Sequence, residues 1–169
     1  AIVMALARQL RFSVLPRGSG SSLAGQAIGP GLILDCTRYL NHIIEINPEA
    51  RTAIVEPGVI LNALNRQALR HQLQFGPDPA SSERATMGGS IANNAAGAHS
   101  IIYGLTVDHL LAADVILSDG ESAAFSRRSL ASARAAAAGR GVEADLYRTA
   151  LEIRANYAEE IYKTWPATW

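Results

Sequence analysis

The residues with the clearest chemical potential lie in a glycine- and serine-rich stretch at residues 16–26. Glycines let the backbone approach a ligand closely and adopt positive φ angles, and successive N–H groups in such a loop can form a nest for an anion. Serine hydroxyls add donors and an arginine adds a cation, so this chemistry suits a phosphate or a pyrophosphate. The candidate binding residues are Arg17, Gly18, Ser19, Gly20, Ser21 and Ser22.

The spacing of these glycines excludes two familiar phosphate-binding loops. Gly20 and Gly25 have the separation of a P-loop, but Gln26 follows where that loop needs a lysine. Gly18 and Gly20 fit the start of a dinucleotide-binding G-x-G-x-x-G word, but Leu23 fills the place of its third glycine. No long helix is expected after these residues, because more glycines and a proline follow. Composition alone leaves a plain surface connection as open as a phosphate site.

A second stretch, residues 85–104, is rich in small residues and lacks large side chains over much of its first half. A segment that passes against a flat ligand or another backbone has this composition, and adjacent asparagines can serve a heterocycle or a ribose. The residues of interest are Thr86, Gly88, Gly89, Asn93, Asn94 and Gly97. The alternative, slightly favoured by this stretch alone, is a turn-rich core connection.

Short strands and helices must position these stretches. Before residue 76, the hydrophobic patterns predict an opening helix, four strands and an amphipathic helix, at residues 1–9, 11–15, 32–35, 43–46, 52–55 and 59–70. After it, a hairpin precedes two helices, at residues 110–117, 121–125, 129–138 and 146–161, with Pro166 closing the last. We expect an α+β fold with two small α/β subdomains, 1–75 and 76–125, and a helical appendage, 126–169.

Composition and charge narrow the class of protein. Of 169 residues, 49% are hydrophobic and 18% charged, which supports a packed core. Lys+Arg and Asp+Glu both number 15, so no nucleic-acid partner is expected through bulk charge. No apolar run approaches the length of a bilayer span, so no membrane-spanning segment is expected. The single cysteine excludes a disulfide framework within the chain and favours a reducing, cytoplasmic location.

The remaining reactive side chains form no recognisable catalytic or metal-binding pattern. The four histidines lack HxxxH and HExxH spacing, so no metal site is predicted. The serines of the first stretch lack a G-x-S-x-G elbow and are not nucleophile candidates. Cys36 follows a predicted strand and is interpreted as a buried structural thiol. No catalytic residue is assigned, because a base role for His99 needs a partner that the sequence does not identify.

A set of short sequence words stands in order along the chain, at residues 15–26, 46–48, 55–59, 75–79, 85–89, 94–95, 103–106 and 108–120. Each word is weak alone, but the ordered set resembles the FAD-binding domain of the vanillyl-alcohol oxidase / p-cresol methylhydroxylase flavoproteins. Within this family, the sequence words most resemble those of the FAD-linked dehydrogenases that act on D-2-hydroxy acids such as D-lactate, glycolate and D-2-hydroxyglutarate. The resemblance covers residues 1–125.

The resemblance implies FAD as cofactor and a role for each glycine-rich stretch. Residues 17–22 would wrap the FAD pyrophosphate with backbone N–H groups. The following residues would line the flavin side or lie near it: Pro77, Asp78, Thr86, Gly88, Gly89, Asn93, Asn94 and Gly97. The chain departs from the family pattern at Ser90, where asparagine is frequent, and at Ala96, where glycine is frequent.

The resemblance also implies a function, the oxidation of a D-2-hydroxy acid to a 2-oxo acid by hydride transfer to flavin. A later glycine-rich segment and a substrate domain complete such enzymes. Because neither is recognisable in these residues, we expect an inactive fragment, with substrate bound through the missing domain and the electron acceptor left open. FAD is expected to be non-covalent, because residues 16–31 contain no His, Cys or Tyr. The alternative is a non-catalytic nucleotide-binding or interaction module that retains the fold.

Overall fold

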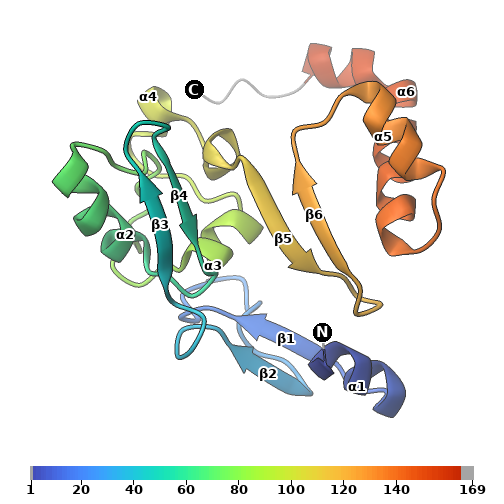
Figure 1. Ribbon diagram of the computed structural model, residues 1–169, viewed down its shortest axis with the longest axis horizontal. Coiled ribbons are helices and arrows are strands. Elements are labelled where there is room, and N and C mark those ends of the chain that lie inside the picture. The colour runs from blue at the N-terminus through green and yellow to red at the C-terminus, as the bar shows by residue number, and fades with distance from the viewer. Residues whose placement is uncertain (1, 165–169) are drawn as a thin grey trace. The chain divides into compact units, whose positions relative to one another are not determined.

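The computed structural model describes residues 2–164, and the chain divides into two compact units (Figure 1). One unit comprises residues 12–110. The other combines residues 2–11 with residues 111–164. In both units the strands stand together in one run and the helices in others, which confirms the α+β class. The predicted subdomain limits after residues 75 and 125 stay predictions.

Two small sheets form the strand part of the 12–110 unit. Strand β1 (Val14–Arg17) pairs in parallel with β2 (Leu32–Asp35), and no helix lies in the connection between them, as predicted. Strands β3 (Ile43–Asn47) and β4 (Thr52–Val55) form an antiparallel hairpin. The first glycine-rich stretch is therefore a loop that returns the chain from the end of β1 to the start of β2.

Strand β1 begins at Val14 and continues to Arg17, whereas the sequence predicted a strand at residues 11–15. The difference arises at Arg11, which has a left-handed φ of 56° directly after the opening helix α1 (Ile2–Leu10). A residue in this conformation commonly follows the last turn of a helix, and it cannot continue into extended backbone. The shift brings Arg17 to the last position of the strand.

The core of this unit forms where α2 (Leu61–Ala68) packs against the β3–β4 hairpin. The helix occupies the predicted region and continues as the short 3₁₀ helix η1 (Leu69–His71). The core combines fully buried and partly buried apolar side chains: Val59, Leu61, Leu64 and Met87, with Ile43, Ile46, Val55 and Phe75 around them. This cluster fixes the start of the second glycine-rich stretch, because Met87 belongs to it.

The second glycine-rich stretch contains helices that the sequence did not predict. Helix α3 (Met87–Ala92) begins after Thr86, whose side-chain oxygen accepts a hydrogen bond from the N–H of Gly89 at 3.3 Å. Glycine disfavours helix, but this N-cap and the burial of Met87 outweigh that preference. Two further short helices follow, α4 (Ser100–Tyr103) and η2 (Thr106–His109).

The second unit combines α1 with a hairpin and two helices. The predicted hairpin is confirmed as β5 (Ala112–Ile116) and β6 (Ser122–Ser126), and the predicted helices as α5 (Leu130–Ala137) and α6 (Val142–Thr164). The ring of Tyr147 lies 5.9 Å from that of Phe125, which attaches α6 to β6. The predicted stop at Pro166 lies outside the described residues. Across residues 2–164, no helix has both the length and the apolar character that a bilayer crossing needs.

Candidate functional site

A pocket of about 610 Å³ in the 12–110 unit is lined by both glycine-rich stretches. The structure therefore brings together segments that are far apart in sequence, as a shared ligand site requires. Ten of the predicted site residues line it: Arg17, Gly18, Ser19, Gly20, Ser21, Ser22, Thr86, Gly88, Gly89 and Asn93. The remaining wall comes from small or neutral residues of both stretches and from Ala27, Cys36, Pro57 and Ser81.

At two of the pocket's glycine positions, close packing against other protein atoms leaves no room for a side chain. A Cβ atom at Gly18 would lie 2.1 Å from Oγ1 of the buried Thr86, and one at Gly88 would lie 2.7 Å from Cβ of Pro57. Gly20 differs, because its φ is 74° and the nearest atoms to an added Cβ are 3.7 Å or more away. Gly18 and Gly88 thus close the pocket wall, while Gly20 leaves open space for a ligand beside its backbone.

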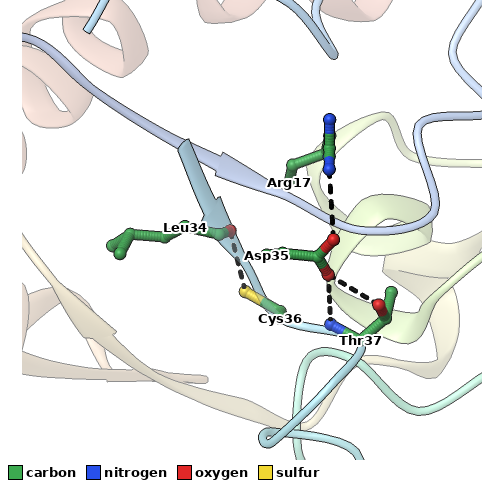
Figure 2. Close-up of polar contacts among 5 residues, drawn as sticks. All are labelled: Arg17, Leu34, Asp35, Cys36 and Thr37. Carbon is green, nitrogen blue, oxygen red and sulfur yellow. Dashed lines mark hydrogen bonds and ion pairs between the residues drawn. The ribbon is translucent and has the colours of Figure 1, made fainter. Parts of the chain in front are cut away.

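Arg17 is the one charged residue among the described residues that line the pocket. The parallel register places it opposite Asp35, and its Nη2 donates to Oδ2 of Asp35 at 3.1 Å. The other carboxylate oxygen accepts from both the side chain and the backbone of Thr37, at 2.6 Å and 2.9 Å. Figure 2 shows the carboxylate held from two sides in this way. The guanidinium is thereby fixed at the end of β1, where the glycine loop begins.

The same contacts set the ionisation of Asp35 and of its neighbour. Hydrogen bonds from Thr37, and then from Arg17, lower the pKa of Asp35 to about 2, so this carboxylate stays charged in all but strong acid. Burial, followed by the charge of Asp35, raises the pKa of the Cys36 thiol. Cys36 is half-buried and lines the pocket, so its interpretation as a buried structural thiol is only partly right. Sequence reasoning missed this placement because it depends on the pairing of β1 with β2, through which the N–H of Cys36 donates to the carbonyl of Arg17 at 2.9 Å.

A separate cluster gathers other predicted flavin-side residues. The backbone N–H of His99 donates to Oδ1 of Asp78 at 3.1 Å, and its ring Nδ1 contacts Oδ2 of the same carboxylate. These hydrogen bonds from His99 lower the pKa of Asp78. A Cβ at Gly97 would lie 2.3 Å from the backbone of Asp78, so Gly97 is needed for this close approach. The structure thus pairs His99 with Asp78, and a base role for His99 stays untested.

Pro77, Asp78, Asn94 and Gly97 do not line the 610 Å³ pocket. Pro77 is buried, and Asn94 has a left-handed φ of 46° while its Oδ1 accepts from the N–H of Val107 at 3.0 Å. The turn role that asparagine commonly fills therefore describes Asn94 well. Flavin contacts from these four residues stay predictions. Over residues 2–164, no three His, Cys, Asp or Glu side chains gather as metal ligands do.

The donors around the pocket fit a diphosphate group. Backbone N–H groups, serine hydroxyls and one arginine head all hydrogen-bond to anionic oxygen, and the glycines leave room for it. The fold and this pocket therefore suit a module that binds a diphosphate-containing ligand. Residues 1–126 match the family described as "FAD binding domain", and the chain belongs to that family.

Relatives and solved structures agree with this family. D-2-hydroxyglutarate dehydrogenase of Escherichia coli (strain K12) is 43% identical over 124 residues, which are 72% of this chain and 12% of that protein. Glycolate oxidase subunit GlcD of the same strain is 39% identical over 122 residues, 71% of this chain and 24% of that protein. The structure of alkyldihydroxyacetonephosphate synthase superposes with a TM-score of 0.64 at 23% identity, covering 75% of this chain and 26% of that one, which shows a shared fold. The matched residues thus span 12–26% of the length of these proteins.

Proposed function

We propose that this chain is the FAD-binding part of an oxidoreductase that converts a D-2-hydroxy acid into a 2-oxo acid. The observation that carries the proposal is the single pocket that both glycine-rich stretches line, with neutral donors and one fixed cation. When bound, FAD supplies a hydride acceptor. The names of two relatives, D-2-hydroxyglutarate dehydrogenase and glycolate oxidase subunit, support a 2-hydroxy acid as the substrate class.

The chain's own residues bind and orient the cofactor in this proposal. Backbone N–H groups of residues 18–22 hold the diphosphate, and Arg17 supplies a positive charge that Asp35 keeps in place. Thr86 holds the second stretch against the first through Gly18. Pro77, Asp78 and residues 86–89 are proposed to line the flavin side, with Asn93, Asn94 and Gly97 nearby.

Binding is tested by titrating the flavin-free chain with FAD and following the quenching of flavin fluorescence. Gly20→Val places a side chain at the pocket wall and is expected to weaken FAD binding at least tenfold. Gly25→Val is the matched control, because Gly25 has a similar φ of 83° but no atom within 4 Å of an added Cβ and no place in the pocket lining. Both variants carry comparable backbone strain. Equal FAD affinity of the two variants would place the diphosphate elsewhere.

The cofactor is proposed to be held without a covalent bond. Cys36 is the thiol in the pocket lining, and its raised pKa disfavours the nucleophilic thiolate. Binding then depends on reversible hydrogen bonds and burial. Acid precipitation of the holoprotein is expected to release all flavin into the supernatant, and flavin remaining with the pellet would contradict the proposal.

Turnover is proposed to need parts of the protein beyond these residues, because the chain matches 12% of one relative and 24% of the other. The flavin-loaded chain is expected to be yellow and to leave D-lactate and D-2-hydroxyglutarate unchanged. Rapid bleaching of the flavin by either acid would show that the chain is itself a working dehydrogenase. A colourless chain that binds ADP but not FAD would support the alternative, a non-catalytic nucleotide-binding module.

A further inference from the structure

Gln26 is an exposed residue at the end of the first glycine-rich stretch, and it lines the pocket. The Oγ of Ser22 donates a hydrogen bond to its Oε1, so a neighbour that lines the same pocket holds the carboxamide. The Nε2 of Gln26 keeps both of its N–H donors, for which no acceptor lies within hydrogen-bonding distance among residues 2–164. The side chain therefore offers neutral donors at the pocket wall, although it was not among the predicted site residues.

The chain turns back after the loop tip and brings residues 26–27 beside the start of the loop. A Cβ at Gly20 would lie 3.7 Å from the side chain of Ala27 and 3.8 Å from Cδ of Arg17. These are the nearest atoms to it, so the space beside the Gly20 backbone is bordered by both. Gln26 thus adjoins the space where the diphosphate is proposed to bind.

The pocket carries little positive charge for a phosphate ligand. Arg17 is the one charged residue in its described lining, and the ion pair with Asp35 offsets that charge. Gln26 stands where the spacing of a P-loop requires a lysine. Such a lysine supplies charge to the terminal phosphates of a nucleotide, which are monoesters with extra negative charge. Gln26 supplies hydrogen bonds without charge, which suits a diphosphate esterified at both ends, as in FAD.

We propose that Gln26 is a specificity-determining residue, which donates to the diphosphate of FAD and disfavours nucleotides that end in a free phosphate, such as ATP. This inference rests on the proposed function and deepens it. Hydrogen bonds from an amide to an ionised oxygen stabilise the diester. The additional charge of a terminal phosphate finds no cation in the described lining and loses part of its hydration there.

FAD titration of two variants tests the contact. Gln26→Glu keeps the shape and the acceptor for Ser22 but replaces the N–H donors by a carboxylate oxygen, and it is expected to weaken FAD binding at least tenfold. Gln26→Ala removes the donors without adding charge and is expected to weaken it about threefold. The same substitutions at Gln67 are matched controls, because this exposed glutamine of α2 lies outside the pocket lining.

Both glutamines are exposed, so the flavin-free variants are expected to melt within about 2 °C of the unmodified chain. The losses of affinity then report on binding and not on folding. A Gln26→Glu or Gln26→Ala variant that binds FAD as tightly as its Gln67 counterpart would overturn the inference.

A lysine variant tests the specificity. Gln26→Lys adds a charge beside the diphosphate, so the ATP concentration that displaces half of the FAD at saturation is expected to fall about tenfold, and less at high salt. Gln67→Lys is the control and should leave this concentration unchanged. Equal displacement by ATP from the two lysine variants would overturn this inference alone. Absence of FAD binding by the unmodified chain would overturn the proposed function as well.

Discussion

Replacing Gly18 with alanine tests whether direct packing holds the two glycine-rich stretches together. The φ of Gly18 is outside the left-handed region, so alanine is allowed there by the backbone. The obstacle is Thr86, which is 2% exposed and whose Oγ1, Cβ and Cγ2 would lie 2.1, 3.2 and 3.2 Å from the new Cβ. Thr86 cannot move freely, because it caps α3 and neighbours the core residue Met87.

The size of the effect follows from two opposing contributions. An added methyl group in a tightly packed site destabilises by about 1–3 kcal/mol. Alanine also restricts the unfolded chain relative to glycine, which offsets about 0.4–1 kcal/mol of this destabilisation. The net loss in the free energy of unfolding is therefore about 1–2 kcal/mol, or about 2–8 °C in melting temperature for a chain of this size. FAD affinity is expected to fall as well, since the pocket wall shifts.

A control and a double variant isolate the contact in thermal denaturation. Gly29→Ala lies in the same β1–β2 connection, where the nearest atom to its Cβ is 3.8 Å away, and is expected to leave stability unchanged or slightly raised. Thr86→Ala removes Oγ1 and the cap, a loss of about 1 kcal/mol by itself. Combined with Gly18→Ala, it should destabilise less than the sum of the single variants, by about 1 kcal/mol. Additive losses, or equal melting of Gly18→Ala and Gly29→Ala, would refute the packing argument.

Three further outcomes are expected. The pKa of Asp35 is lowered to about 2, so its carboxylate stabilises the fold above its ordinary pKa of 3.8 and loses that contribution as the pH falls towards 2. The melting temperature of Asp35→Asn should therefore drop less over this pH range than that of the unmodified chain. An equal drop would contradict the assignment. The raised pKa of Cys36 predicts that its thiol reacts slowly with a thiol reagent at neutral pH and faster in alkali. Because Cys36 lines the pocket, FAD should protect it, and labelling unaffected by FAD would place the cofactor elsewhere. His99→Ala should move the pKa of Asp78 back towards its ordinary value, as carboxyl NMR would report, and an unmoved titration would mean that another group holds this carboxylate.

The sequence was sufficient to predict those elements whose formation depends on neighbouring residues alone. Asp119-Gly120, a dipeptide typical of hairpin turns, stands between the two predicted strands of the β5–β6 hairpin, and Gly120 has a φ of 90°. The helix-free connection between β1 and β2 followed from its glycines and proline. The start of β1 was missed because the left-handed cap at Arg11 leaves no mark in composition. Helix α3 was missed because paired glycines hid an N-cap at Thr86 that depends on local geometry.

The candidate site was predictable only in part, because several of its groups meet through tertiary structure. The glycine-loop residues could be named from their types and from the family resemblance. Asp35 could not, because its pairing with Arg17 is set by the parallel register. A usable signal did exist, since an aspartate two residues before Thr37 is typical of a local side-chain hydrogen bond. Gln26 was noted only as the residue that breaks a P-loop pattern, because its place in the pocket wall depends on how the loop turns back.

The anchoring of the first loop at both ends has a consequence for engineering. Arg17 is tied to Asp35, and the N–H of Leu32 donates to the carbonyl of Ser13 at 2.9 Å, so the strand pairing does not depend on the loop's length. At its tip, Leu23 is fully exposed and Gly25 has open space around it. Doubling a loop costs only about 0.6 kcal/mol in closure entropy. A peptide tag or a fluorescent reporter inserted between Leu23 and Gly25 should therefore leave β1 and β2 paired, and would sit beside the cavity as a sensor of its occupancy.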